Sequence, residues 1–138
     1  MSHATERAGA VERPLSPHIQ IYSPLINMVM SIIHRMTGVA LYFGTLLLVW
    51  WLIAAATGPA YYAYVAKLLG HPIGLAILIG YTWALVHHML GGVRHFIWDT
   101  GRGFDLKTVN WLCWGTLVAS IALTAAIWAV VLRLKGVI

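Results

Sequence analysis

The sequence predicts an all-α membrane protein with three transmembrane helices. Hydrophobic residues make up 60% of the chain and charged residues only 9%, whereas charged residues occupy about 25% of an ordinary soluble domain. The apolar residues occur in long uninterrupted runs, and about 20 such residues suffice to cross a bilayer. The single cysteine, Cys113, excludes an intrachain disulfide.

Residues 1–22 are expected to form an N-terminal tail and an interfacial arm. Residues 1–14 are small and polar and lack the apolar core of a signal peptide, so we expect a flexible, uncleaved tail. Pro14 and Pro17 favour an extended arm over a helix in the segment that follows.

Residues 23–138 are expected to form the membrane domain, with helices at about 24–56, 71–97 and 110–132. Pro24 fits the first turn of the first helix, and Gly58-Pro59 ends it. The tyrosines at 61, 62 and 64 predict an interfacial belt after that break. A short polar loop at 98–108 separates the last two helices.

The distribution of cations predicts the orientation of the chain. Six of the nine lysines and arginines are expected on the side that holds the N-terminus and the loop between the second and third helices: Arg7, Arg13, Arg35, Arg94, Arg102 and Lys107. The remaining three are expected on the other side: Lys67, Arg133 and Lys135. The first side is therefore predicted to be inside. Cations at segment ends also explain the net charge of +5 without a nucleic-acid partner.

Residues 88–101 carry the first functional signal. His88 lies deep in the second helix, and its neighbours on the same face, Ala84, Gly91 and Gly92, are all small. A deep imidazole beside a flat surface suits a planar ligand such as haem, whose iron commonly takes an axial histidine. The alternative is a membrane histidine that hydrogen-bonds to a neighbouring helix.

His87 is the rival ligand. It lies about 100° around the helix from His88, beside the bulkier Trp83, so packing or a bond to another helix is the favoured interpretation. The third helix has no histidine and the first has only His34, near the interface. A second imidazole ligand would therefore come from another chain.

Ser31 and Arg35 share one face at the start of the first helix. An arginine there is often a cation that reaches the lipid phosphates. A hydroxyl and a guanidinium at the hydrocarbon edge can also hydrogen-bond a quinone carbonyl and stabilise the charge that develops on reduction.

Two motifs resemble those of a known family. The first comprises residues 13–18 and 31–38, and the second, His88-x-x-x-Gly92-Val-Arg94-His95, continues to Trp98-Asp99-x-Gly101. Both, in this order, resemble the cytochrome b membrane-anchor subunit of succinate dehydrogenase (complex II), most closely its alphaproteobacterial and mitochondrial members. The resemblance covers the chain from about residue 13 to its end.

The resemblance implies a role for each site residue. His88 falls at the axial haem b ligand, and Ser31 and Arg35 fall where ubiquinone binds. The haem propionates would be surrounded by His34, Arg94 and His95. The haem would be shared with a small membrane-anchor subunit, so that this chain forms half of a heterodimeric anchor bundle.

The function implied is electron transfer from succinate oxidation to ubiquinone, in the tricarboxylic acid cycle and the respiratory chain. The chain itself would be a non-catalytic anchor, and an iron–sulfur subunit and a flavoprotein subunit would complete the enzyme. We expect it in the bacterial inner membrane with its N-terminus in the cytoplasm; the alternative is the mitochondrial inner membrane with the N-terminus in the matrix. A haem-free structural anchor of a related quinone-linked complex is the alternative function.

Overall fold

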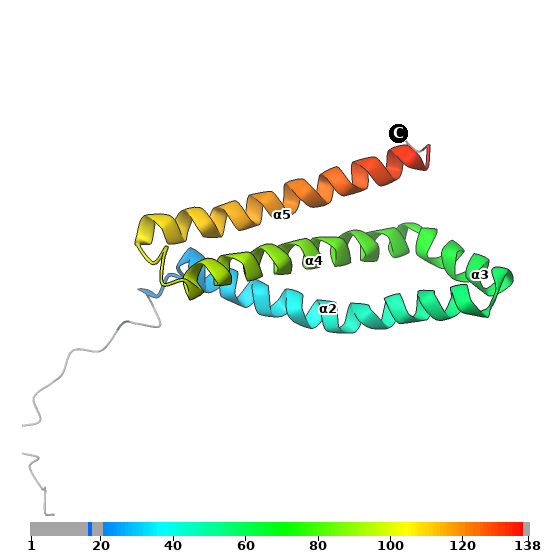
Figure 1. Cartoon of the computed structure of the whole chain (residues 1–138), viewed down its shortest axis with the longest axis horizontal. Coiled ribbons are helices and arrows are strands. Elements are labelled where there is room, and N and C mark those ends of the chain that lie inside the picture. Colours follow the sequence, from blue (N-terminus) through cyan, green and yellow to red (C-terminus); the bar gives the residue numbers. More distant parts are fainter. Residues whose placement is uncertain (1–16, 18–20, 137–138) are drawn as a thin grey trace, which may run out of the picture.

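The computed structural model describes residue 17 and residues 21–136 of the 138-residue chain. This part consists of the helices α2 (Ile26–Thr57), α3 (Pro59–Gly70), α4 (Pro72–Asp99) and α5 (Leu106–Leu134), and it contains no strand (Figure 1). By length and composition, α2, α4 and α5 can each cross a membrane. The predicted all-α fold with three spans is confirmed. Of the expected tail and arm, only residues 17, 21 and 22 are described.

Helix α2 is the longest helix and sets the length of the bundle. Its 32 residues extend about 48 Å at about 1.5 Å per residue, well beyond the roughly 30 Å of a hydrocarbon core. The helix ends at Gly58, whose φ of 137° favours glycine over any residue with a side chain. The predicted break lies here, but Pro24 precedes the helix instead of occupying its first turn.

Helix α3 was not expected as a helix. Pro59 occupies its first position, where a missing N–H costs nothing, so the Gly58-Pro59 pair that ends α2 also starts α3. Three tyrosines of the expected belt project from it and are exposed: Tyr61, Tyr62 and Tyr64. Trp50 of α2 donates a hydrogen bond to the Tyr61 hydroxyl at 2.9 Å, which ties α3 to the end of α2.

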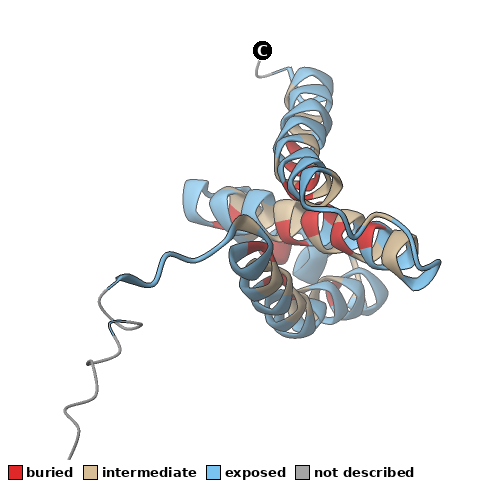
Figure 2. Cartoon of the chain, turned by 90° about the vertical axis from the view of Figure 1, so that its left-hand side faces the viewer, coloured by how far each residue is buried: buried red, intermediate tan, exposed pale blue. Residues whose placement is uncertain are grey.

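Helices α4 and α5 are joined by a short loop with two glycines in the left-handed region, Gly101 and Gly103. Helix α5 begins at Leu106, four residues before the expected start, because Asp105 caps it by accepting a hydrogen bond from the Thr108 N–H at 2.9 Å. Helix α4 packs against all three other helices, and α5 also contacts α2. The buried residues lie where the helices meet, and most outward surfaces are exposed (Figure 2).

The start of α2, the end of α4 and the start of α5 lie at one end of the bundle, and α3 and the C-terminus lie at the other (Figure 1). The predicted site residues on α2 and α4 are all within about ten residues of that first end. The fold therefore brings residues 31–35 close to the second half of α4, whose sequence lies more than 50 positions away.

Candidate functional site

The His88 side chain occupies the interface between α4 and α2. Its Nδ1 lies 3.0 Å from the main-chain oxygen of His34 and 3.3 Å from the Thr37 hydroxyl, which itself donates to the same carbonyl at 2.8 Å. A carbonyl can only accept a hydrogen bond, so the proton of the neutral imidazole resides on Nδ1. The lone pair is then on Nε2, which has no hydrogen-bond partner among the described residues. The protein therefore holds Nδ1, and the Nε2 lone pair is available to a ligand or metal.

His34 and His95 complete a histidine cluster around this ring. The imidazoles of His34 and His88 stack in parallel, with centroids 4.0 Å apart and planes inclined by 5°. The centroid of His95 lies 5.2 Å from that of His34. His34 is half-buried, and its Nδ1 is buried without a hydrogen-bond partner in the described part of the chain. The cluster therefore joins both candidate motifs at one place.

Glycines on α2 and α4 leave room for the stacked His34 and His88 rings. On α4, one of the small residues next to His88 is covered by α2 and another is open. A Cβ at Gly91 would overlap the His34 ring, and a Cβ at Gly38 would come within 3.0 Å of the His88 ring. Gly91 therefore makes room for His34 and not for an external planar ligand. Gly92 differs, because a Cβ there would meet nothing within 4 Å. The flat surface still open to a ligand lies at Gly92.

His87, one residue before His88, faces the opposite neighbour, α5. It is fully buried, and its Nδ1 lies 3.1 Å from the Ser120 hydroxyl, which donates to the Leu117 carbonyl and so accepts from the imidazole. The expected role of His87 in packing or bonding to a helix agrees with this contact. The two adjacent histidines thus serve two different helix interfaces.

Arg94 also lies between α4 and α5 rather than within the histidine cluster. Only 3% of it is exposed, and its Nη1 donates to the Cys113 sulfur at 3.7 Å. Its guanidinium carbon lies 5.3 Å from the Trp98 ring centroid. The guanidinium Nε is buried and has no partner among the described residues. Of the basic residues expected beside a haem, His95 adjoins the cluster and Arg94 packs against α5.

Ser31 and Arg35 lie in the first turns of α2, at the same end of the bundle as the cluster. Ser31 is half-buried and Arg35 is exposed. With a spacing of four residues they share a helix face, and the exposure of Arg35 leaves its guanidinium accessible from outside the chain.

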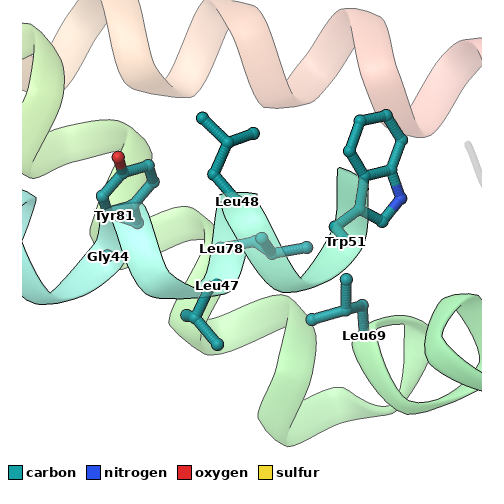
Figure 3. A pocket seen from close by; sticks show the side chains of 7 residues that line it. All are labelled: Gly44, Leu47, Leu48, Trp51, Leu69, Leu78 and Tyr81. Atoms are coloured by element: carbon teal, nitrogen blue, oxygen red, sulfur yellow. The ribbon is translucent and has the colours of Figure 1, made fainter. Parts of the chain in front are cut away.

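A separate apolar pocket of about 220 Å³ lies between α2, α3 and α4 (Figure 3). Tyr81 packs directly against Gly44, where a Cβ would overlap its ring, and Trp51 lies farther along α2 (Figure 3). Gly44 is ten residues beyond His34, or about 15 Å along the helix. The pocket contains no charged side chain and was not predicted from the sequence.

Comparison with known proteins identifies the family. The model of the succinate dehydrogenase/fumarate reductase transmembrane subunit matches residues 10–130. The chain belongs to this family. The resemblance inferred from the two motifs is thereby confirmed.

Relatives within the family are similar over most of the chain. The succinate dehydrogenase cytochrome b556 subunit of Rickettsia prowazekii is 42% identical over 85% of this chain and 91% of its own length. The cytochrome b556 subunit of Paracoccus denitrificans is 38% identical over 80% of this chain and 85% of its own. The mitochondrial cytochrome b560 subunit of Sus scrofa is 38% identical over 71% of this chain and 59% of its own. The chain is therefore a membrane subunit of the succinate dehydrogenase/fumarate reductase type.

Sequence reasoning missed two residues that shape the site in this family member. Thr37 and Gly38 both contact His88 from α2, and both belong to the first motif. Their proximity in sequence to His34 was visible, but a single sequence does not indicate which residue on another helix they face.

Proposed function

We propose that this chain is the cytochrome b membrane anchor of a succinate dehydrogenase, which binds haem b through His88 and forms part of a ubiquinone-reduction site. The observation that carries the proposal is the hydrogen bond from His88 Nδ1 to the His34 carbonyl. Ligand histidines are typically held through their other ring nitrogen, often by a carbonyl, so that the lone pair points at the metal. The names of the relatives as cytochrome b subunits support haem b as the group bound.

The choice of His88 over His87 rests on their different surroundings. His87 is fully buried against α5 and bonded to Ser120, so a ligand could reach it only by separating two helices. His88 is half-buried and lies beside the open Gly92 surface. A bound haem would supply a one-electron carrier at this position. The protein's contribution is to orient the His88 ring and to restrict access of water to it.

His34 and His95 are proposed to surround the haem propionates, together with Arg35 at the membrane edge. Imidazolium and guanidinium groups form strong charge-assisted hydrogen bonds with carboxylates. The clustering of His34 and His95 with His88 supports this role. Arg94 is omitted from the direct contacts, because its guanidinium packs against α5 and its one hydrogen bond among the described residues is to Cys113.

Ser31 and Arg35 are proposed to hydrogen-bond the ubiquinone carbonyl. Their position in the first turns of α2 would open to lipid from the side and to water from the adjacent surface. Arg35 would stabilise the negative charge that develops on the quinone oxygen as it is reduced. Electrons would arrive from succinate oxidation in the soluble subunits.

The remaining components are proposed to come from other subunits. A small membrane-anchor subunit would supply the second axial ligand, since His34 stacks in parallel on the His88 ring instead of facing it across a metal, and His87 is bonded to Ser120 of α5. An iron–sulfur subunit and a flavoprotein subunit would oxidise succinate. The assembly is proposed to lie in the bacterial inner membrane with the N-terminus of this chain in the cytoplasm, in keeping with its six cations against three.

The test is a pair of substitutions at adjacent positions, His88→Leu and His87→Leu. A reduced-minus-oxidised spectrum of the purified complex should lose its b-type signal in His88→Leu and retain it in His87→Leu. Subunit composition, read from a gel of each preparation, distinguishes ligand loss from failed assembly. A b-type signal of unchanged intensity in His88→Leu would refute the ligand assignment, and a wild-type complex without haem would favour the haem-free anchor.

A further inference from the structure

The α4–α5 interface contains a positive charge that the proposed function does not use. Arg94 is 3% exposed, and the only hydrogen bond that its guanidinium makes to the described residues is to the thiol of Cys113, at 3.7 Å. A thiol is a weak acceptor, and the buried Nε has no partner in the described part of the chain. A buried guanidinium without an anionic partner is strongly unfavourable. This surface of the helix pair is therefore suited to an anion.

A groove of about 190 Å³ runs beside Arg94 along the junction of α4 and α5. Gly115 forms part of it, and a Cβ at that position would meet nothing within 4 Å, so the groove is open above the Gly115 backbone. Its other residues include Leu90, Val93, Leu112, Thr116 and Ala119. Apart from Arg94 and Thr116, the lining is apolar, as an acyl chain requires.

A second cavity of about 410 Å³ lies next to the groove, and Trp111 lines both. Lys107 and Asn110 line this second cavity, together with Trp114. Lys107 is six residues before Cys113, or about 9 Å nearer the connecting loop along α5. A second cation therefore lies between Arg94 and the membrane surface.

The order of these groups matches the chemistry of a phospholipid. Lys107 and Asn110 lie nearest the loop between α4 and α5. The exposed Trp111 and Trp114 follow, and indole rings favour the membrane interface. The apolar groove continues from there past Arg94, away from the loop. Basic pockets between transmembrane helices are typical sites for anionic headgroups. A soluble anion would leave the apolar groove unused.

We propose that the loop end of α4 and α5 binds an anionic phospholipid, with its phosphate between Arg94 and Lys107 and one acyl chain along the groove. The lipid would neutralise the buried guanidinium and hold α5 against α4. This site is distinct from the proposed haem and quinone sites, and its test does not depend on either cofactor.

The experiment is a lipid titration of the delipidated complex, purified with its copurifying subunits and followed by native mass spectrometry. Phosphatidylglycerol should bind more tightly than phosphatidylcholine. Lys107→Gln should weaken phosphatidylglycerol binding by about fivefold, as expected from roughly 1 kcal/mol per basic residue. Arg102→Gln is the matched control, because Arg102 is an exposed cation in the loop just before α5 and lines neither cavity, so its replacement should change binding little.

Arg94 is tested by two further variants. Arg94→Gln should reduce phosphatidylglycerol binding more than Lys107→Gln does, and Arg94→Lys should restore part of it. If Arg94→Gln does not assemble, the comparison of Lys107 with Arg102 still decides, because Lys107 is exposed and its side chain makes no hydrogen bond or ion pair among the described residues.

Three results would overturn the proposal. Equal binding of the two lipids to the wild-type complex would show that the site does not select an anionic headgroup. Equal effects of Lys107→Gln and Arg102→Gln would indicate a general surface-charge effect. Displacement of phosphatidylglycerol by an equal concentration of inorganic phosphate would indicate a soluble-anion site.

Discussion

The His88 imidazole is oriented by a main-chain carbonyl from a different helix. The hydrogen bond from Nδ1 to His34 O depends on the path of the α2 backbone, so it does not require a particular side chain at position 34. The His34 ring contributes separately, by stacking on His88 at 4.0 Å. The tautomer of His88 and the packing around it are thus set by two different parts of the same residue.

Gly91 is predicted to be the residue that permits this stacking. In Gly91→Ala the new methyl group would overlap the His34 ring, and overpacking of this kind typically costs about 1–3 kcal/mol. The melting temperature of the purified chain in detergent, followed by circular dichroism, should therefore fall. Gly80→Ala on the same helix is the control, since a Cβ there meets nothing within 4 Å and alanine favours the helix. Equal melting temperatures for the two variants would contradict this explanation.

At the scale of elements, the sequence predicted the helices that consist of long apolar runs. It did not predict α3 or the start of α5, which depend on a few polar, glycine or proline residues. The three spans follow from uninterrupted apolar runs of about 20 residues or more, which favour helices in a bilayer because a helix satisfies its own backbone hydrogen bonds. Helix α3 is short and rich in tyrosine, and Gly58-Pro59 signals a break without indicating that Pro59 also starts a helix. The sequence predicted a start of α5 four residues too late, because the first turn of the helix lies in a polar stretch that resembles a loop. Asp105 caps this turn by accepting a hydrogen bond from the Thr108 N–H.

The Asp105 cap predicts a pH dependence at the start of α5. The hydrogen bond from the Thr108 backbone N–H holds the pKa of the Asp105 carboxyl below its ordinary value near 4. Because the folded-state pKa is lowered, the stabilisation is present above about pH 4 and is lost as the pH falls through the lowered value.

Melting temperatures of the purified chain between pH 3 and pH 7 check this prediction. Asp105→Asn should match the wild type at pH 7, since asparagine caps as well, and should lose less stability at pH 3 because it does not titrate. Asp105→Ala should be less stable than both at pH 7. Parallel pH profiles for wild type and Asp105→Asn would show that another group controls the acid response.

At the scale of the whole molecule, large apolar side chains cover much of the outer surface of the chain, including Phe43, Leu46, Phe96 and Val118. An exposed apolar area this extensive is expected of a surface that faces lipid or another membrane subunit. The sequence predicted this environment, and it placed Arg35 and Arg94 on the same side of the membrane. It could not predict that α2 packs His34 onto Gly91, or that Arg94 turns to α5, because the faces of uniformly apolar helices are not distinguished by hydropathy.

The proposed quinone site predicts that two activities of the complex can be separated. Arg35 is exposed at the start of α2, so Arg35→Leu should leave the fold of the chain intact. Loss of a donor to the developing negative charge should lower succinate-dependent ubiquinone reduction by roughly tenfold or more. Succinate oxidation by an artificial soluble acceptor should change little, because those electrons leave before the membrane. Arg133→Leu, an exposed cation at the opposite end, should affect neither activity. Parallel loss of both activities in Arg35→Leu would mean that Arg35 supports attachment of the soluble subunits and not the quinone.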